Sequence, residues 1–182
     1  KRYYPYDTLA SKVLGFTGSD NQGIIGLEVI YEEYLAGKKG TILTVTDARG
    51  IEVEEAGESR IEPVNGGDLH ISMDMNIQSY ATQLAYQAME TKEARSVSII
   101  VMNAKTGEIL AMVNTPEFDL NEPYVLTEDI LKYAGGTDVS GNSISSGDDL
   151  SEQEKQNLLN TMWRNGCIND TYEPGSTFKI IT

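Results

Sequence analysis

One stretch of the sequence, residues 96–114, constrains the fold more than any other. It reads SVSIIVMNAKTGEILAMVN. Its first eight residues form a short run rich in β-branched side chains, which is typical of a buried strand. AKTG predicts a turn, and EILAMVN predicts a second strand that returns beside the first. The stretch therefore predicts a two-stranded hairpin.

A helix is predicted directly before this hairpin. Asp74 is a suitable N-cap for a helix that runs from Met75 to about Lys92. Apolar side chains recur there at helical spacing and predict one buried face, made of Ile77, Tyr80, Ala81, Leu84 and Ala88. The preceding residues 68–74, DLHISMD, alternate like a strand.

The residues before this helix and hairpin differ in composition, being rich in glycine and tyrosine to about residue 68. Residues 23–40 carry apolar side chains at helical spacing, which predicts a short amphipathic helix that Gly37 ends. Residues 40–57 alternate around Asp47-Ala48-Arg49-Gly50 and predict a second hairpin. PVNGG, residues 63–67, predicts a turn and a boundary. We therefore expect one domain over residues 1–68 and a second over residues 69–182.

The second half ends in a loop and a helix. The segment from about residue 119 to residue 149 is polar and rich in glycine and serine, which favours a loop. Ser151 and Glu154 have the spacing of a capping box. They predict the start of a helix that continues through Leu158, Leu159 and Met162.

Composition excludes several classes of function. The 182 residues carry a net charge of -14, which argues against nucleic acid as a partner because phosphate contacts need a basic surface. One cysteine, Cys167, cannot form an intrachain disulfide, and with one histidine, His70, it cannot complete a zinc site. His70 lies in a strand-like pattern and is interpreted as structural. No apolar run reaches the roughly 18 residues of a membrane span.

Three short strings resemble the signatures of the penicillin-recognising serine enzymes, which are SxxK, SxN and KTG. They are Ser176-Thr177-Phe178-Lys179, Ser19-Asp20-Asn21 and Lys105-Thr106-Gly107. In those enzymes SxxK comes first and KTG last, whereas here SxxK comes last. Ser19-Asp20-Asn21 is therefore interpreted as a glycine-rich turn, Lys105-Thr106-Gly107 as the hairpin turn, and Ser140-Gly141-Asn142 as loop.

The string EPGSTFK fits nucleophilic chemistry. Pro174 and Gly175 favour a sharp entry into a helix, with Ser176 at or near its N-terminus. Residues three apart in a helix advance about 4.5 Å and share one side, so Lys179 can reach the Ser176 hydroxyl. A serine alcohol needs such a base. The helix dipole favours negative charge on the serine oxygen and disfavours a proton on the lysine. The alternative is a serine N-cap followed by a surface lysine.

Nearly the whole chain resembles the class B penicillin-binding proteins, the monofunctional peptidoglycan transpeptidases. Residues 4–40, from YPYD to GKKG, are similar to the family's pedestal, often called the dimerisation domain. SMDMNIQSYA resembles the opening of its transpeptidase domain, and SIIVMNAKTGEILAMVNTPEFDLN resembles its first hairpin. RNGCINDTYEPGSTFKIIT resembles its nucleophile block, which maps Ser176 onto the acylated serine and Lys179 onto the general base. The segment over residues 124–156 resembles the family less closely.

The resemblance implies an α+β fold, in which a β-containing pedestal precedes an antiparallel sheet flanked by helices. It implies serine acyl transfer at the D-Ala-D-Ala end of peptidoglycan stem peptides, inhibition by β-lactam antibiotics, and no metal or organic cofactor. It also implies residence on the extracytoplasmic face of the cell membrane, with cell-wall synthesis partners such as a glycosyltransferase. The process served would be cell shape, cell division or sporulation.

The sequence is interpreted as a fragment, because it has no initiator methionine and stops just after SxxK. The fragment alone is expected to be inactive, since it contains no counterpart of the family's SxN and KTG. Two rival classes stay open on the motif alone. One is a non-enzymatic scaffold that binds the cell-wall machinery, and the other is a β-lactam sensor or β-lactamase that shares SxxK. The pedestal resemblance argues against the sensor and the β-lactamase.

Overall fold

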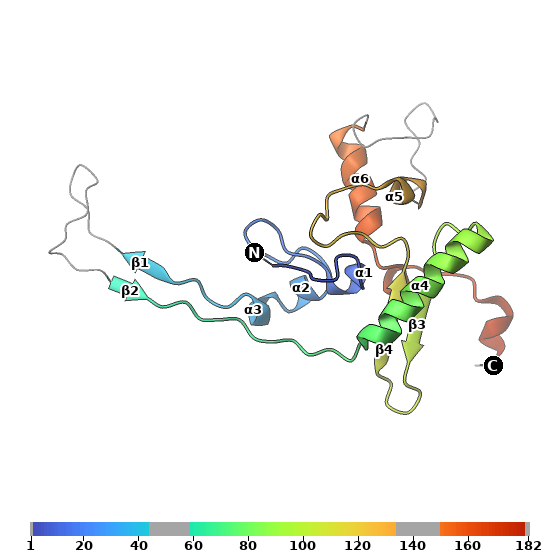
Figure 1. Ribbon diagram of the computed structural model, residues 1–182, viewed down its shortest axis with the longest axis horizontal. Coiled ribbons are helices and arrows are strands. Elements are labelled where there is room, and N and C mark those ends of the chain that lie inside the picture. The colour runs from blue at the N-terminus through green and yellow to red at the C-terminus, as the bar shows by residue number, and fades with distance from the viewer. Residues whose placement is uncertain (1, 44–58, 134–149, 181–182) are drawn as a thin grey trace.

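The computed structural model describes residues 2–43, 59–133 and 150–180. Figure 1 shows a body, built around α4 and the β3–β4 hairpin, from which an arm carrying β1 and β2 extends. The elements, in chain order, are α1 (Ser11–Leu14), α2 (Gly26–Ile30), α3 (Glu32–Leu35), β1 (Thr41–Leu43), β2 (Ser59–Ile61), α4 (Met75–Lys92), β3 (Ser98–Met102), β4 (Ile109–Asn114), α5 (Glu128–Tyr133), α6 (Glu152–Trp163), α7 (Gly166–Asn169) and the 3-10 helix η3 (Gly175–Ile180).

The α4 helix begins and ends as the sequence predicts. The Asp74 side chain accepts hydrogen bonds from the backbone N–H groups of Asn76 and Ile77 at 2.9 and 3.0 Å. These two bonds satisfy donors that have no partner within the helix. The helix ends at Lys92, where Glu93 adopts a left-handed conformation with φ of 52°. The N-cap prediction at Asp74 is therefore confirmed.

The predicted buried face of α4 is only partly correct. Small side chains, Ala81 and Ala85, pack against Ala111 and Val113 of β4, whereas Tyr80 is 63% exposed. Gln78 is buried, and its side-chain amide pairs with the backbone of Met112 through bonds of 3.1 and 2.8 Å. The helix thus lies close to the sheet, and Gln78 supplies hydrogen-bond partners to the edge of β4. The periodicity of apolar residues does not predict this polar contact.

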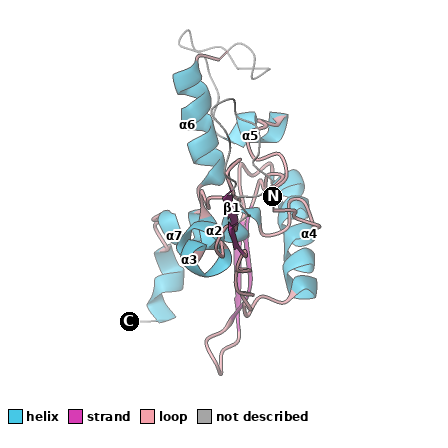
Figure 2. Cartoon of the chain, turned by 90° about the vertical axis from the view of Figure 1, so that its left-hand side faces the viewer, coloured by secondary structure: helices cyan, strands magenta, loops and turns pink. Residues whose placement is uncertain are grey.

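The predicted hairpin of residues 96–114 is confirmed. β3 and β4 pair antiparallel from Ser98 opposite Asn114, with a register shift between Val101 and Met102. The two faces of β3 are covered unequally: Ile99 and Val101 are half-buried, while Ile100 is 49% exposed. The expectation of a buried strand is therefore only partly correct, because Ile100 and Met102 are exposed. α4 covers one side of the hairpin, and α7 lies on the other (Figure 2).

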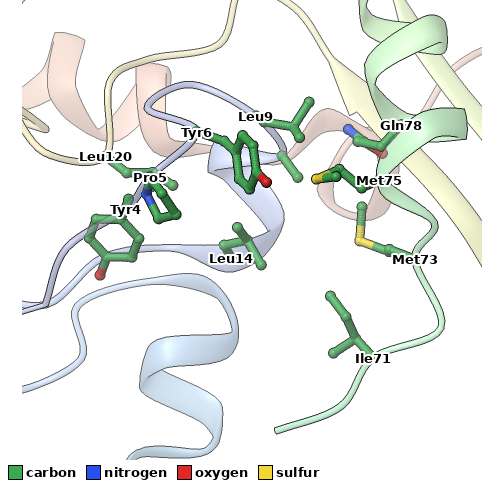
Figure 3. A pocket seen from close by; sticks show the side chains of 11 residues that line it. Tyr4, Pro5, Tyr6, Leu9, Leu14, Ile71, Met73, Met75, Gln78 and Leu120 are labelled. Carbon is green, nitrogen blue, oxygen red and sulfur yellow. The ribbon is translucent and has the colours of Figure 1, made fainter.

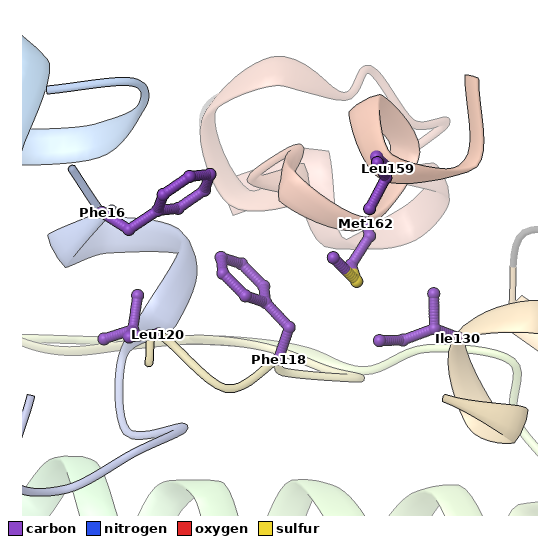
Figure 4. Close-up of a cluster of buried hydrophobic side chains, with 6 residues drawn as sticks. All are labelled: Phe16, Phe118, Leu120, Ile130, Leu159 and Met162. Atoms are coloured by element: carbon purple, nitrogen blue, oxygen red, sulfur yellow. The ribbon is translucent and has the colours of Figure 1, made fainter. Parts of the chain in front are cut away.

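A second core brings the first residues of the chain against the second half. Its six buried side chains are Phe16, Phe118, Leu120, Ile130, Leu159 and Met162 (Figure 4). Phe16 meets Phe118 edge to face, with ring centroids 6.1 Å apart, and lies 5.2 Å from Trp163. Such aromatic contacts add to the stabilisation from buried area. The division at residue 68 stays a prediction, and this core packs residues from both sides of it.

The helix α6 carries the predicted capping box. The Ser151 side chain accepts from the backbone N–H of Glu154, and the Glu154 carboxylate accepts from the backbone N–H of Ser151 at 3.0 Å. Leu159 and Met162 are buried, and Leu158 is half-buried. Both the start and the inward face of this helix are confirmed.

The segment that includes the arm differs from its prediction in its helix. The single helix expected over residues 23–40 is broken at Tyr31 into α2 and α3. Gly37 has a φ of 65°, and a Cβ there would lie 2.3 Å from the carbonyl oxygen of Val64, so this position requires glycine. β1 pairs antiparallel with β2, whereas the turn predicted at residues 47–50 lies outside the described residues.

The strand predicted for residues 68–74 is absent from the described structure. The segment is extended but joins no ladder; Ser72 Oγ donates to the Ile109 carbonyl at 2.8 Å, and the Asp74 N–H donates to the Leu110 carbonyl at 2.9 Å. His70 is exposed. The alternating sequence pattern of residues 68–74 therefore does not lead to strand pairing.

An apolar cavity of about 170 Å³ lies where this segment meets the first residues of the chain (Figure 3). Its lining comes from residues 4–14, from residues 71–78 and from Leu120. Both this cavity and the Phe16 core place the N-terminal segment against the body. None of the described helices is long and apolar enough to cross a membrane.

Candidate active site

The candidate nucleophile lies on the short helix η3. Pro174 lacks an N–H and fixes its own φ, and Gly175 follows with a φ of 57°, a left-handed conformation that favours glycine. The Pro174 carbonyl then accepts from Thr177 twice, from the backbone N–H at 3.4 Å and from Oγ1 at 2.5 Å. These features open a tight turn with Ser176 as its second residue, as expected for a serine near a helix N-terminus.

Ser176 and Lys179 share one side of this turn. In a 3-10 helix residues three apart are eclipsed, so their side chains leave the helix in nearly the same direction. All four residues from Ser176 to Lys179 are exposed in the chain as described. The turn therefore puts the two residues that the sequence singled out on one side, and both are open to water.

The segment before the turn is fastened to β4. Asn165 caps the short helix α7 by accepting from the Cys167 N–H at 3.0 Å. Cys167 Sγ in turn donates to the Val113 carbonyl at 3.2 Å. Arg164 binds the Asp170 carboxylate at 2.5 Å, which closes the segment on itself. The approach to Ser176 is thus held by short contacts up to Asp170.

A buried polar cluster, made of Lys12, Asn114, Glu117 and Asn165, lies beside this segment. Lys12 Nζ donates to Asn114 Oδ1 at 3.2 Å. Glu117 Oε1 accepts from the Ala10 N–H at 3.1 Å, while its Oε2 is buried with no hydrogen-bond partner among the described residues. Burial lowers the pKa of Lys12 to about 8, and burial raises the pKa of Glu117 to about 7.

Sequence reasoning missed this cluster. Its contacts join residues that are about a hundred positions apart, such as Lys12 with Asn114 and Ala10 with Glu117. A lysine and a glutamate that far apart give no local pattern, so no signal in one sequence could have found them. Burial also raises the pKa of Cys167.

Two of the short strings, KTG and SDN, lie in turns of other segments than the one that carries Ser176. Lys105-Thr106-Gly107 forms the β3–β4 turn, where Gly107 has a φ of 80° and its N–H donates to the Asn103 carbonyl at 2.8 Å. Ser19-Asp20-Asn21 forms the tip of a loop between Thr17 and Gly23. Both turn predictions are confirmed. Ser140-Gly141-Asn142 lies outside the described residues, and within those residues no acidic, histidine or cysteine side chains gather into a metal site.

The fold and the order of these segments are those of one family. Residues 1–71 match the model of the penicillin-binding protein dimerisation domain, and residues 97–182 match that of the penicillin-binding protein transpeptidase domain. The chain belongs to the penicillin-binding proteins, and a dimerisation domain followed by the start of a transpeptidase domain is the arrangement of class B.

Particular relatives resemble this chain over nearly its whole length. The probable peptidoglycan D,D-transpeptidase PenA of Neisseria gonorrhoeae is 34% identical over 98% of this chain and 26% of PenA. Stage V sporulation protein D of Bacillus subtilis is 31% identical over 100% of this chain and 23% of its own length. Penicillin-binding protein 2 of Helicobacter pylori, solved in complex with MreC, has a TM-score of 0.56 at 27% identity, covering 99% of this chain and 31% of that one. The chain spans about a quarter of the length of these curated relatives.

Proposed function

We propose that this chain is part of a peptidoglycan D,D-transpeptidase in which Ser176 is the acylated nucleophile and Lys179 its general base. The observation that carries the proposal is the tight turn η3, which opens at Pro174 and carries both residues on one side. The similarity to a D,D-transpeptidase over 98% of the chain supports it.

The proposed reaction begins when Ser176 Oγ attacks the carbonyl carbon between the two terminal D-alanines of a stem peptide. Lys179 accepts the hydroxyl proton, an ester forms, and the peptide bond breaks to release D-alanine with that proton. The amine of a second stem peptide then attacks the ester and loses a proton, the bond to Ser176 Oγ breaks, and that oxygen takes up the proton, which frees Ser176 and leaves a new amide cross-link. N–H groups at the start of η3 lack acceptors within the helix and are suited to the developing oxyanion.

A β-lactam would enter the same path as an alternative acyl donor. Attack by Ser176 opens the strained ring amide and forms an ester, but the amine stays attached to the acyl group. Because no leaving group departs, the ester persists, and it provides a stable label for the nucleophile. Neither step requires a metal or an organic cofactor.

The proposal also covers the setting of the reaction. We place the intact protein on the extracytoplasmic face of the cell membrane, where peptidoglycan is its substrate. We expect a glycosyltransferase that makes glycan strands to be a partner, because newly made strands are the substrate for cross-linking. The H. pylori relative forms a complex with MreC, which supports the expectation that this chain also has a protein partner.

Labelling of the intact protein with a fluorescent penicillin tests the assignment. Ser176→Ala should abolish the label, and Lys179→Ala should slow acylation by about 10² to 10⁴ because a positioned base is lost. Two controls are matched to these changes: Ser79→Ala removes an exposed hydroxyl from α4, and Lys105→Ala changes the KTG string in the hairpin turn. Both controls should label at the wild-type rate. A label that survives Ser176→Ala, or that is lost in Lys105→Ala, contradicts the proposal.

A further inference from the structure

The buried polar cluster connects α1 to the segment that leads to Ser176. Asn114 Oδ1 accepts from Lys12 Nζ at 3.2 Å and also from the Gly166 N–H at 3.0 Å. A second bond joins the same two segments, since Asn165 Nδ2 donates to the Lys12 carbonyl at 3.4 Å. One oxygen atom on β4 is therefore shared between a lysine from the start of the chain and the first residue of α7.

The orientation of the Asn114 amide is fixed by a third partner. Its Nδ2 donates to Ser98 Oγ at 2.8 Å, across the β3–β4 hairpin. Turning the amide over would point its N–H groups at the amine of Lys12 and at the N–H of Gly166, which are both donors. The Oδ1 atom must therefore face the two donors, and it accepts from Lys12 and from Gly166 at the same time.

Stability alone does not explain a lysine at this position. Lys12 is only 5% exposed, and burial of a charged amine costs free energy that nearby Glu117 offsets in part. An apolar side chain of similar length would fill the same space without that cost. Lys12 differs from such an apolar side chain because its amine donates a hydrogen bond to Asn114 Oδ1, the atom that also accepts from the Gly166 N–H.

We propose that Lys12 is a positioning residue that holds α7 against β4 and so sets the direction in which the chain runs from α7 to Ser176; the inference rests on the transpeptidase function proposed above. Gly166 begins α7, and the chain passes from there through Asp170 to η3. A Cβ on Gly166 would lie 2.8 Å from an Asp170 carboxylate oxygen, so the segment is closely packed around this contact. A shift of α1 against β4 would move Gly166 and, through it, the nucleophile.

This arrangement gives the N-terminal segment a route to the catalytic one. A change in the Lys12–Asn114–Gly166 contact should alter the rate of acylation more than the affinity for the acyl donor, because Lys12 is buried and we assign it no contact with the donor. The relation is a coupling between two segments that are far apart in sequence, since Lys12 and Asn165 are 153 positions apart.

The test is carried out on the intact protein with Lys12→Met, which keeps the length of the side chain and removes the N–H donors. We expect the rate constant for acylation by saturating penicillin to fall about tenfold, with the non-covalent dissociation constant unchanged. Lys92→Met, which changes an exposed lysine at the end of α4, is the matched control and should acylate normally. Lys12→Met combined with Asn114→Ala should be no slower than Asn114→Ala alone, because both act through one contact.

A second variant separates positioning from stability. Glu117→Gln added to Lys12→Met removes the buried charge that the lysine offset, so it should restore the thermal midpoint while acylation stays slow. Recovery of the acylation rate together with the midpoint would show that Lys12 acts only on stability and would overturn the inference. So would a wild-type rate in Lys12→Met.

Amide hydrogen exchange keeps the inference independent of the proposed function. In Lys12→Met the peptide that covers residues 165–170 should exchange faster, whereas peptides from α6 should not change. If wild-type protein takes no penicillin label, the proposed function falls, and exchange alone decides whether Lys12 holds this segment. Unchanged exchange at residues 165–170 would refute the positioning role in either case.

Discussion

Glu117→Gln should remove a pH-dependent loss of stability. Burial raises the pKa of this carboxyl from 4.5 to about 7, so the folded state holds the proton more tightly than the unfolded state does. As the pH rises from about 4.5 to about 7, the unfolded chain loses the proton first, and the free energy of unfolding falls. Above about pH 7 the whole cost of burying the charge is present.

The shift from 4.5 to about 7 sets the size of the effect. At 1.36 kcal/mol for each pKa unit, it corresponds to a loss of at most about 3 kcal/mol. Glutamine keeps an acceptor for the Ala10 N–H but cannot ionise. It also removes the charge that offsets Lys12, so we expect a net gain of about 1 to 3 kcal/mol near pH 7.5 and almost none near pH 4.5.

Thermal unfolding across this pH range tests the prediction. The wild-type midpoint should fall as the pH rises from about 4.5 to about 7.5, and the midpoint of Glu117→Gln should fall less. The upper limit is kept below the pKa of Lys12, which burial lowers to about 8, and burial raises the pKa of the adjacent Tyr86 further from this range. Parallel pH profiles for the two proteins would show that Glu117 is not held protonated by burial, and the reasoning would be wrong.

Three further predictions follow from the fold. Asp74→Ala should lower the free energy of unfolding by about 1 kcal/mol, seen in a denaturant titration, because two N–H groups of α4 lose their acceptor; Asp74→Asn should retain most of it. Phe118→Ala should cost about 3 to 5 kcal/mol in the same titration, since a fully buried ring is removed from the core around Phe16; a loss below about 1 kcal/mol would contradict this packing. The 182-residue chain alone should gain no mass from labelled penicillin within minutes. Ser176 and Lys179 are exposed to water, whereas a nucleophile and its base need a water-excluded site. Stoichiometric labelling of this chain would contradict the prediction.

Local signals in the sequence predicted local structure well. Asp74 and the Ser151–Glu154 pair marked helix starts, because capping depends on residues two or three positions apart. The turn at Lys105-Thr106-Gly107 was predictable for the same reason, since Gly107 supplies the positive φ that a tight turn requires. These features depend on the chain's immediate neighbours and little on the rest of the fold.

Contacts between distant segments were not predictable from one sequence. The inward face of α4 is set by how closely the helix lies on β4, which selects Gln78 and Ala85 and leaves Tyr80 outside. The pairing of Lys12 with Asn114 depends on α1 being folded against β4. For the candidate site, the motif and the resemblance singled out Ser176 and Lys179 as candidates, while the contacts of Asn165 and Gly166 with distant segments became visible only in three dimensions.

The most direct test of the central claim is to locate the acyl group in the intact protein. After reaction with a β-lactam, proteolysis and mass spectrometry should find the adduct on the peptide that spans Pro174 to Lys179, with fragmentation assigning it to Ser176. The adduct should be absent from Ser176→Ala. An acyl group on Thr177, on Ser19 of the SDN string or on any other side chain would contradict the account.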